Sequence, residues 1–350
     1  MVYSIDGING VMFALGIGIT HSLINHGPSI FIGIPDENSP LITLPGKKFV
    51  LKGEGSKAFF TTYYGSITGV IITCLFLYPL YFFYNYFLEI ISYIQNFIII
   101  IILFYIILSC KKIREGLLTV FLGSLVGLIV FNINSIGTSE AFLPMFAGLF
   151  GTPLLVKKFS NDFPVQKINF FFPNKKNFVG GFKGFIAGIF SSVLPGIGPS
   201  STATVLDTED RLEFMSALGS VNTTNIITSM IIILTSLRSR TGLADFIISN
   251  YSTEKIKILY IISVGIISSG LTLLLSKKIV FMFSFILEKI DEKIIKITII
   301  TLLLLLILYM TGHTGVSIYF ISTGVGLISS RLDAKKSLLM SCIIIPVLLL

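Results

Sequence analysis

The sequence predicts an all-α, polytopic membrane protein with about ten transmembrane helices and at least one re-entrant hairpin. Of its 350 residues, 53% are hydrophobic and only 13% are charged, and the mean hydropathy is +0.89. The surface of a water-soluble protein does not tolerate this composition. Apolar stretches of roughly 20 residues, the length at which a helix crosses a bilayer, recur along the chain. Residues 157–183 form the one long polar interval, so we expect no soluble domain.

The candidate spans lie where apolar runs are long enough to cross lipid. Backbone polar groups in lipid must be paired within the protein, so these spans are expected to be helices. The predicted spans are residues 8–33, 59–84, 90–109, 116–133, 141–156, 211–237, 256–276, 294–311, 315–330 and 337–350. Residues 180–206 and 278–290 look too broken or too short to cross, so we expect re-entrant or interfacial segments there.

The basic residues alternate between successive loops. Loops 35–58, 111–114 and 157–183 are rich in lysine, whereas loops 85–89 and 134–140 contain neither lysine nor arginine. Because short basic loops stay in the cytoplasm, the lysine-rich loops are predicted to be cytoplasmic. The net charge of +8 therefore reports topology, and we expect no nucleic-acid binding. The chain has no tryptophan, so anchoring at the outer interface is assigned to Tyr78, Tyr81, Tyr84 and Tyr86.

The sharpest interruption of the apolar pattern is Leu-Pro-Gly-Ile-Gly-Pro-Ser-Ser at residues 194–201. Proline lacks a backbone donor and glycine permits tight geometry, so two half-helices are expected to meet at a tip here. The half-helix that follows presents free N–H groups and a partial positive charge, which suit a carboxylate or another anion. The alternative is a kinked, tightly packed helix pair without a ligand. The predicted substrate-binding residues of this tip are Pro195, Gly196, Gly198, Pro199, Ser200 and Ser201.

A second group of candidates lies on the span that follows. Asn222 and Asn225 are neighbours on one helical face, where amides are costly against lipid and useful against a polar substrate or another helix. Arg238 and Arg240 follow at the far end of this span and can hold a carboxylate through paired hydrogen bonds. The alternative for the arginines is a solvated outer loop.

A third interruption places acidic residues directly after the first span. Asp36, Glu37 and Asn38 are candidates for binding a coupling cation, Na⁺ or H⁺, or else they cap the exit of the span. His21 and His26 lack the spacing of two metal ligands on one helical face, and the three cysteines form no CxxC motif. We therefore expect no metal site and no further cofactor.

Several of these motifs together resemble a known family. In chain order, residues 28–38, 44–48, 52–58, 148–153, 194–199, 220–225 and 238–242 carry PSIFIGIPDEN, LPGKK, KGEGSKA, GLFGTP, LPGIGP, SVNTTN and RSRTG. This series resembles the large membrane subunit of the tripartite tricarboxylate transporters (TctA), especially its archaeal branch, and the likeness extends nearly to the C-terminus.

The resemblance implies two inverted repeats, each with a Pro-Gly hairpin and a second broken segment. On this basis residues 1–156 hold the first repeat, residues 157–183 a cytoplasmic loop, residues 184–276 the second repeat and residues 277–350 the C-terminal helices. The hairpin of the first repeat has no counterpart, because the chain opens where the segment after it would begin. Bacterial relatives have a Gly-rich tip where this chain has residues 35–38, so specificity for tricarboxylates is not carried over.

The function implied by the resemblance is a multi-pass permease of the cell membrane, not an enzyme, that moves small organic anions, above all carboxylates, with an ion gradient. Bacterial relatives work with a periplasmic binding protein and a small membrane subunit, and whether this chain has such partners or forms a homodimer stays open. One alternative is an inactive or truncated transporter-like scaffold. Another is an intramembrane enzyme, which is disfavoured because Asp207 and Asp210 lie in an acidic loop and no GxGD motif follows a span.

Overall fold

The computed structural model describes residues 7–32, 40–108, 110, 112–133, 137–156, 164–168, 171–194, 199, 202, 210–236, 241–252, 256–332 and 334–349. All regular secondary structure in these residues is helical, which confirms the all-α class. Six of the described helices are long and apolar enough to cross a membrane, or seven spans if a bent helix pair counts as one. The chain is therefore a polytopic membrane protein.

The described helices and turns follow one another without strands between them. They are α1 (Gly7–Ile24), α2 (His26–Phe31), η2 (Pro40–Ile42), α3 (Thr43–Val50), α4 (Gly55–Leu75), α5 (Leu77–Leu108), α6 (Ile113–Phe131), α7 (Thr138–Phe146), the π-helical turn η3 (Ala147–Gly151), α8 (Thr152–Val156), α9 (Lys175–Val193), α11 (Arg211–Ser236), α12 (Gly242–Asn250), α13 (Ile258–Lys289), α14 (Glu292–Arg331), η4 (Lys336–Met340) and α15 (Ser341–Leu349).

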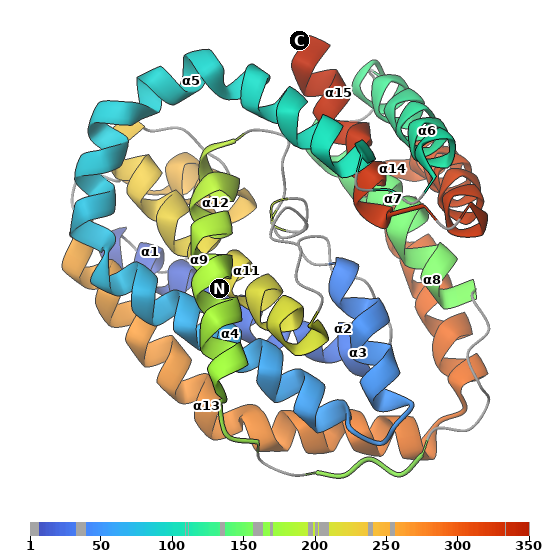
Figure 1. The fold of residues 1–350 in the computed structure, drawn as a ribbon, viewed down its shortest axis with the longest axis horizontal. Coiled ribbons are helices and arrows are strands. Elements are labelled where there is room, and N and C mark those ends of the chain that lie inside the picture. The colour runs from blue at the N-terminus through green and yellow to red at the C-terminus, as the bar shows by residue number, and fades with distance from the viewer. Residues whose placement is uncertain are drawn as a thin grey trace.

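Long helices enclose shorter ones. In Figure 1, α5, α13 and α14 run along the outside of the molecule, whereas α4, α9 and α11 lie within this ring. Burial agrees with the view: 89% of the most apolar part of α11 and 72% of that of α4 are buried, against 28% for α13 and 17% for α14. The outer helices therefore have the exposed apolar surface that lipid requires, and α11 is the central helix.

Helices α4, α9 and α11 pack closely and run in the same direction. The hydroxyls of Ser216 and Ser220 on α11 donate to the carbonyls of Asn177 and Gly181 on α9, so residue numbers rise together on the two helices. A Cβ built at Gly184 would lie 2.3 Å from the carbonyl oxygen of Ala217. Glycines thus let the backbones approach, and serine and threonine hydroxyls bond across the contact, as expected for helices packed within a membrane.

Two stretches of the chain repeat the same order of elements with opposite directions. The first holds the span formed by α1 and α2, then α3 and α4, and the second holds α11, α12 and α13. A Cβ at Gly16 would meet Ser268 and one at Gly27 would meet Phe283, so α1 and α2 run parallel to α13. The pair α4 and α11 runs the opposite way. On α4 the Tyr63 hydroxyl donates to the Ser269 carbonyl of α13, whereas Cys74, further along α4, lies 3.3 Å from a Cβ built at Gly265 of α13, so α4 and α13 are antiparallel. The span α1–α2 therefore points against α11, and α4 points against α13, as in an inverted repeat.

A second hydrophobic core lies beside the first. It includes residues of α6, α7, η3, α14, η4 and α15, together with the second half of α5. Close contacts again occur at glycines: a Cβ at Gly127 would lie 1.8 Å from the carbonyl oxygen of Cys342, and one at Gly148 would lie 2.6 Å from that of Tyr319. Helix α5 joins the two cores and bends by 82° between its segments Leu77–Ile91 and Tyr93–Tyr105.

Part of the long polar interval lies against the helices. Gln166 is buried and accepts from the amide of Gly55 through Oε1, while its Nε2 donates to the carbonyl of Val50. The backbone amide of Gln166 donates to a carboxylate oxygen of Glu288 near the end of α13. The interval therefore connects the turn between α3 and α4 to the end of α13.

Several predicted boundaries need correction. Residues 278–290 were expected to be re-entrant or interfacial, but they continue the predicted span 256–276 as the single helix α13, since nothing between them breaks a helix. The predicted spans 294–311 and 315–330 meet at Gly312, whose φ of 63° is non-helical, within α14. Residues 141–156 form α7, η3 and α8 in succession, and residues 337–350 include η4 and the short helix α15.

Candidate functional site

The side of α11 that carries the predicted amides faces away from its close partners. Ser216, Ser220 and Thr224 contact α9, and Gly219 and Thr223 contact α4. At 100° per residue, the amide positions 222 and 225 fall on the opposite side of the helix. The remaining contacts of α11 are with α1, α3, α5, α12 and α13. The small and hydroxyl residues of α11 thus contact α9 and α4, and its two asparagines lie on the other side of the helix.

Asn222 and Asn225 are buried without full hydrogen bonding. Their exposed fractions are 3% and 7%. Neither Nδ2 nor Oδ1 of Asn222, nor Oδ1 of Asn225, has a hydrogen-bond partner among the described residues. A buried amide without a partner costs about 1–3 kcal/mol, so such groups call for an explanation. A polar group that the described residues do not supply, such as a ligand, fits this place.

Hydroxyl groups surround the end of α9 that leads into the predicted tip. The hydroxyls of Tyr84 on α5 and Ser192 on α9 lie 3.0 Å apart, and both side chains are buried. On the adjoining faces of α4 and α11, the Thr73 hydroxyl donates to that of Thr224 at 3.1 Å. The first bond joins the end of α9 to α5, and the second joins α4 to α11.

Of the predicted tip and loop residues, the structure describes Pro199. Pro195, Gly196, Gly198, Ser200, Ser201, Arg238, Arg240, Asp36, Glu37 and Asn38 lie outside the described residues. Pro199 is buried, and the hydroxyl of the buried Thr202 donates to its carbonyl at 2.9 Å. The structure brings Asn222 and Asn225 together on one helix, and the roles assigned to all these residues stay predictions.

Two short helices, α3 and α12, follow the acidic segment 36–38 and the basic segment 238–240 in the chain. Helix α3 follows the segment with Asp36, and α12 begins at Gly242 directly after the segment with Arg240. Both short helices contact α11. The Thr241 side chain caps α12 by accepting from the amide of Ala244 at 3.2 Å. The helices that adjoin both candidate segments therefore contact the helix that carries the amide pair.

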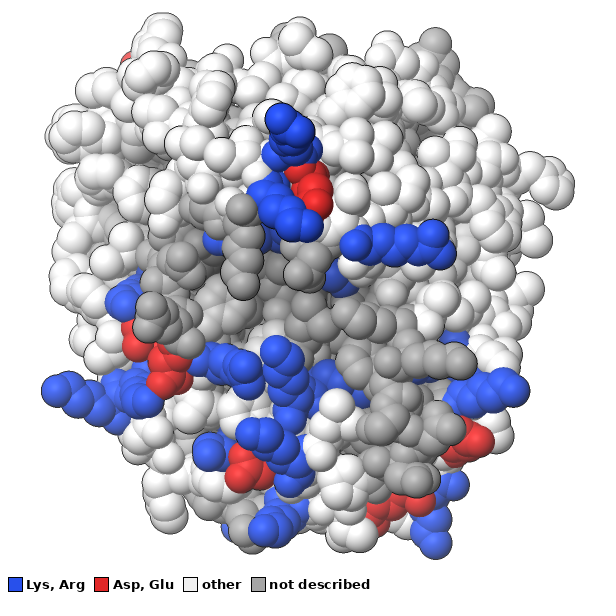
Figure 2. Space-filling view, turned by 45° about the vertical axis from the view of Figure 1, so that its right-hand side comes forward, with Lys and Arg blue, Asp and Glu red and all other residues white. Residues whose placement is uncertain are grey.

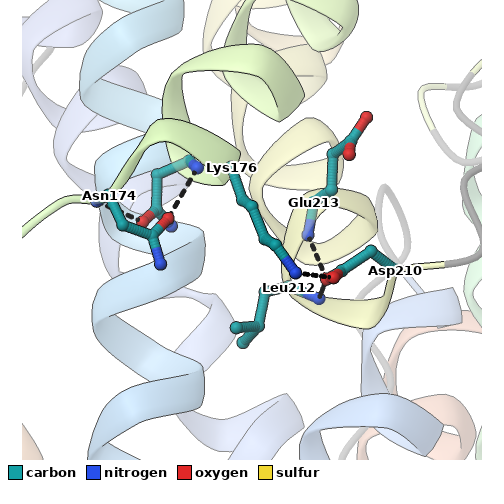
Figure 3. A network of polar contacts seen from close by, with 6 residues as sticks. Asn174, Lys176, Asp210, Leu212 and Glu213 are labelled. Atoms are coloured by element: carbon teal, nitrogen blue, oxygen red, sulfur yellow. Dashed lines mark hydrogen bonds and ion pairs between the residues drawn. The ribbon is translucent and has the colours of Figure 1, made fainter.

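The starts of α9 and α11 are joined by ion pairs at the basic end of the molecule. Lys176 binds the Asp210 carboxylate, which also accepts from the amides of Leu212 and Glu213 (Figure 3). Lys183 pairs with Glu213 at 2.5 Å. The hydrogen bond from Lys176, followed by those from the two amides, lowers the pKa of Asp210 below its ordinary value of 3.8.

Cations gather on one part of the surface. Figure 2 shows lysines and arginines clustered on the face in view, beside a broad area without charges. The described lysines at or near the starts of the parallel helices include Lys57, Lys175, Lys176 and Lys183. The positive-inside rule assigns this end of α4, α9 and α11 to the cytoplasm. Among the described residues no group of three His, Cys, Asp or Glu side chains is arranged to hold a metal ion.

The sequence interpretation missed the role of Tyr84. It was expected to anchor the outer interface, but its side chain is fully buried, whereas Tyr78 and Tyr86 are exposed by 54% and 70%. One signal could have separated Tyr84 from Tyr86: the two lie two residues apart in a helix, so their side chains project about 200° apart. The hydroxyl residues that contact it lie too far away in sequence to be recognised.

Comparison with known proteins points to one family. The profile described as "Tripartite tricarboxylate transporter TctA family" matches residues 1–341. An uncharacterized protein of Methanocaldococcus jannaschii, MJ1079, is 26% identical over 361 residues, which covers 97% of this chain and 88% of that protein. No solved structure matches.

Proposed function

Because this chain belongs to the tripartite tricarboxylate transporter TctA family, we propose that it is a secondary transporter that carries small organic anions, chiefly carboxylates, across the membrane with an ion gradient. Membership of the family makes the chain a multi-pass component of a transporter. The substrate class, the coupling and the residues that bind are the proposal.

The observation that carries the proposal is the buried amide pair of α11. A buried amide without a partner is destabilising, so Asn222 and Asn225 favour a group beyond the described residues that pairs with them. The Nδ2 group of Asn222 is a donor that suits a carboxylate oxygen. The oxygens of both amides are acceptors that suit a substrate hydroxyl or a cation. Both asparagines lie in α11, the most buried of the described spans, so a substrate bound there is enclosed by other helices.

The rest of the proposed site comes from the sequence. In this proposal Pro195, Gly196, Gly198 and Pro199 form the turn of the tip. Ser200 and Ser201 supply backbone and hydroxyl donors, and Arg238 and Arg240 supply guanidinium groups. Asp36, Glu37 and Asn38 bind the coupling ion, Na⁺ or H⁺. The family also makes a binding protein and a small membrane subunit the expected partners of this chain.

Uptake by purified protein in liposomes tests the proposal. We expect labelled citrate or a smaller dicarboxylate to accumulate when a Na⁺ or H⁺ gradient is imposed, and Asn222→Leu to abolish accumulation. Removing a buried amide that lacks a partner is neutral or stabilising for the fold, so Asn222→Leu should keep or raise the melting temperature. Asn132→Leu is the control, because Asn132 ends α6 with its amide already bonded to Leu128.

Two results would contradict the proposal. If Asn222→Leu lowers the melting temperature and loses activity together, the amide is structural. If no carboxylate accumulates under either gradient in a folded wild-type protein, the alternative of an inactive transporter-like scaffold is favoured.

A further inference from the structure

A cavity of about 950 Å³ opens at the ends of four helices. Its described lining comes from the first turns of α5, the last turn of α11, the end of α12 and the start of α13. Helices α4 and α11 begin at the basic end of the molecule and α13 runs against them, so the cavity lies at the opposite end. By the positive-inside rule this end faces the outside.

The polar lining groups of the cavity suit an anion. They are Tyr78, Tyr81, Thr235, Tyr251, Ser252 and Lys257. Each of these side chains can donate a hydrogen bond, and none of the described lining residues is aspartate or glutamate. The other lining residues are isoleucine or leucine, which suit the carbon skeleton of an organic acid.

Lys257 lies at a position where membrane proteins seldom carry a cation. It lies at the outer end, where short loops of membrane proteins carry few lysines, and it immediately precedes the first turn of α13. The first N–H groups of a helix lack partners within it and carry a partial positive charge. An anion in the cavity would therefore meet both the ammonium group and the helix start.

The cavity lies in line with the amide pair. Ile233 lines the cavity, and it occupies the same side of α11 as Asn222, because three helical turns separate them. At 1.5 Å per residue the distance along the helix is about 16 Å. The cavity and Asn222 therefore lie on the same side of one helix.

We propose that this cavity is the outer entry site of the transporter, in which Lys257 and the tyrosine hydroxyls hold a carboxylate before the anion moves along α11 to Asn222. This inference rests on the proposed function. The ligand is an organic oxyanion with one or more carboxylates, taken from the outer solution, and the phosphate of a lipid headgroup is the competing source of the same chemistry.

Protection of Lys257 from chemical modification tests binding directly. The full chain in phosphatidylcholine nanodiscs is treated with a water-soluble amine reagent, and modification of each lysine is followed by mass spectrometry. Citrate is expected to slow modification of Lys257 about fivefold, relative to sodium chloride of equal ionic strength. Lys289, at the other end of α13, is the internal control and should react at an unchanged rate.

Transport kinetics give the second measurement. Lys257→Gln should raise the KM for citrate about tenfold, leave the maximal rate unchanged, and keep the melting temperature, because Lys257 is exposed. Lys257→Arg should restore the KM, and Lys289→Gln should not change it.

The outcomes separate this inference from the proposed function. Uptake with an unchanged KM in Lys257→Gln, together with no protection by citrate, would overturn the entry site and leave the transporter intact. Protection without uptake would overturn the transporter and keep the anion site. If phosphatidylglycerol in the nanodisc protects Lys257 and citrate adds nothing, the cavity holds a lipid headgroup and the entry site is wrong.

Discussion

Helices α11 and α14 are both long apolar segments, yet they occupy opposite environments. In α11, 89% of the most apolar part is buried, whereas in α14 the figure is 17%. Helix α14 includes a run of isoleucine and leucine at residues 302–308, and α11 carries Gly219, Ser220, Asn222, Thr223 and Thr224 in one stretch. Hydropathy predicts that a segment enters lipid, but small and hydroxyl residues predict which segment other helices will cover. Within α11, the hydroxyls of Ser220 and Thr223 bond to neighbouring helices, whereas the Asn222 side chain makes no hydrogen bond to the described residues.

The largest expected effect comes from a bulky side chain placed between α9 and α11. Gly184→Leu would drive a side chain into the Ala217 carbonyl, so we expect it to destabilise the fold by about 3 kcal/mol and to reduce the yield of folded protein. Gly324→Leu on α14, where nothing lies within 4 Å of the added Cβ, is the matched control. Yield and melting temperature in detergent measure both. Equal tolerance of the two variants would mean that α9 and α11 are not in contact.

The second core offers a sharper test within a single helix. Gly127→Ala would place its Cβ 1.8 Å from the carbonyl oxygen of Cys342, whereas Gly116→Ala would place its Cβ 3.4 Å from the nearest atom. We expect Gly127→Ala to cost about 2 kcal/mol of stability and Gly116→Ala to cost almost none. Thermal unfolding of the two proteins measures the difference. A melting temperature that falls more in Gly116→Ala would exclude the α6–α15 contact.

A smaller effect separates the two polar sides of α11. Ser220→Ala removes a hydroxyl that donates to Gly181 at 2.6 Å, so it should cost about 0.6–1 kcal/mol, the usual range for such bonds in membranes. It should leave transport intact, the reverse of the outcome expected for Asn222→Leu. Chemical unfolding measures the stability of Ser220→Ala and Asn222→Leu, and liposome uptake measures their transport. If Ser220→Ala abolished uptake at full stability, the functional face of α11 would be the one that contacts α9.

The smallest effect concerns the solvated ends of α9 and α11. The pKa of Asp210 is lowered in the folded protein, so its ion pair stabilises the fold above the ordinary value of 3.8 and loses this contribution as the pH falls from there through the lowered pKa. Asp210→Asn should therefore lower the melting temperature slightly at pH 7 and by less at pH 3. The effect is small because the pair is partly exposed. An equal decrease at both pH values would assign the role of Asp210 to capping alone.

The sequence predicted the class and the central polar features, because composition and local pattern determine them. Apolar length indicated helices in lipid, and the i, i+3 spacing of Asn222 and Asn225 correctly placed them on one face of one helix. The continuity of α13 could not be recognised from Lys277 and Lys278 alone, because long basic side chains at a helix surface can extend to the headgroups. Helical spacing separates Tyr84 from Tyr86, but it could not identify the buried partner of Tyr84, because Ser192 is distant in sequence.

The common direction of α4, α9 and α11 has a consequence for biosynthesis. Helix α4 leaves the ribosome long before α9 and α11, and Gly65 and Gly69, which contact α11 in the finished protein, have no partner until then. Neighbouring helices that run antiparallel can insert as a hairpin, but three parallel ones cannot. Helices α4, α9 and α11 therefore come together late, by lateral association of segments that are already in the bilayer. Until then the small residues of α4 are not covered by α11.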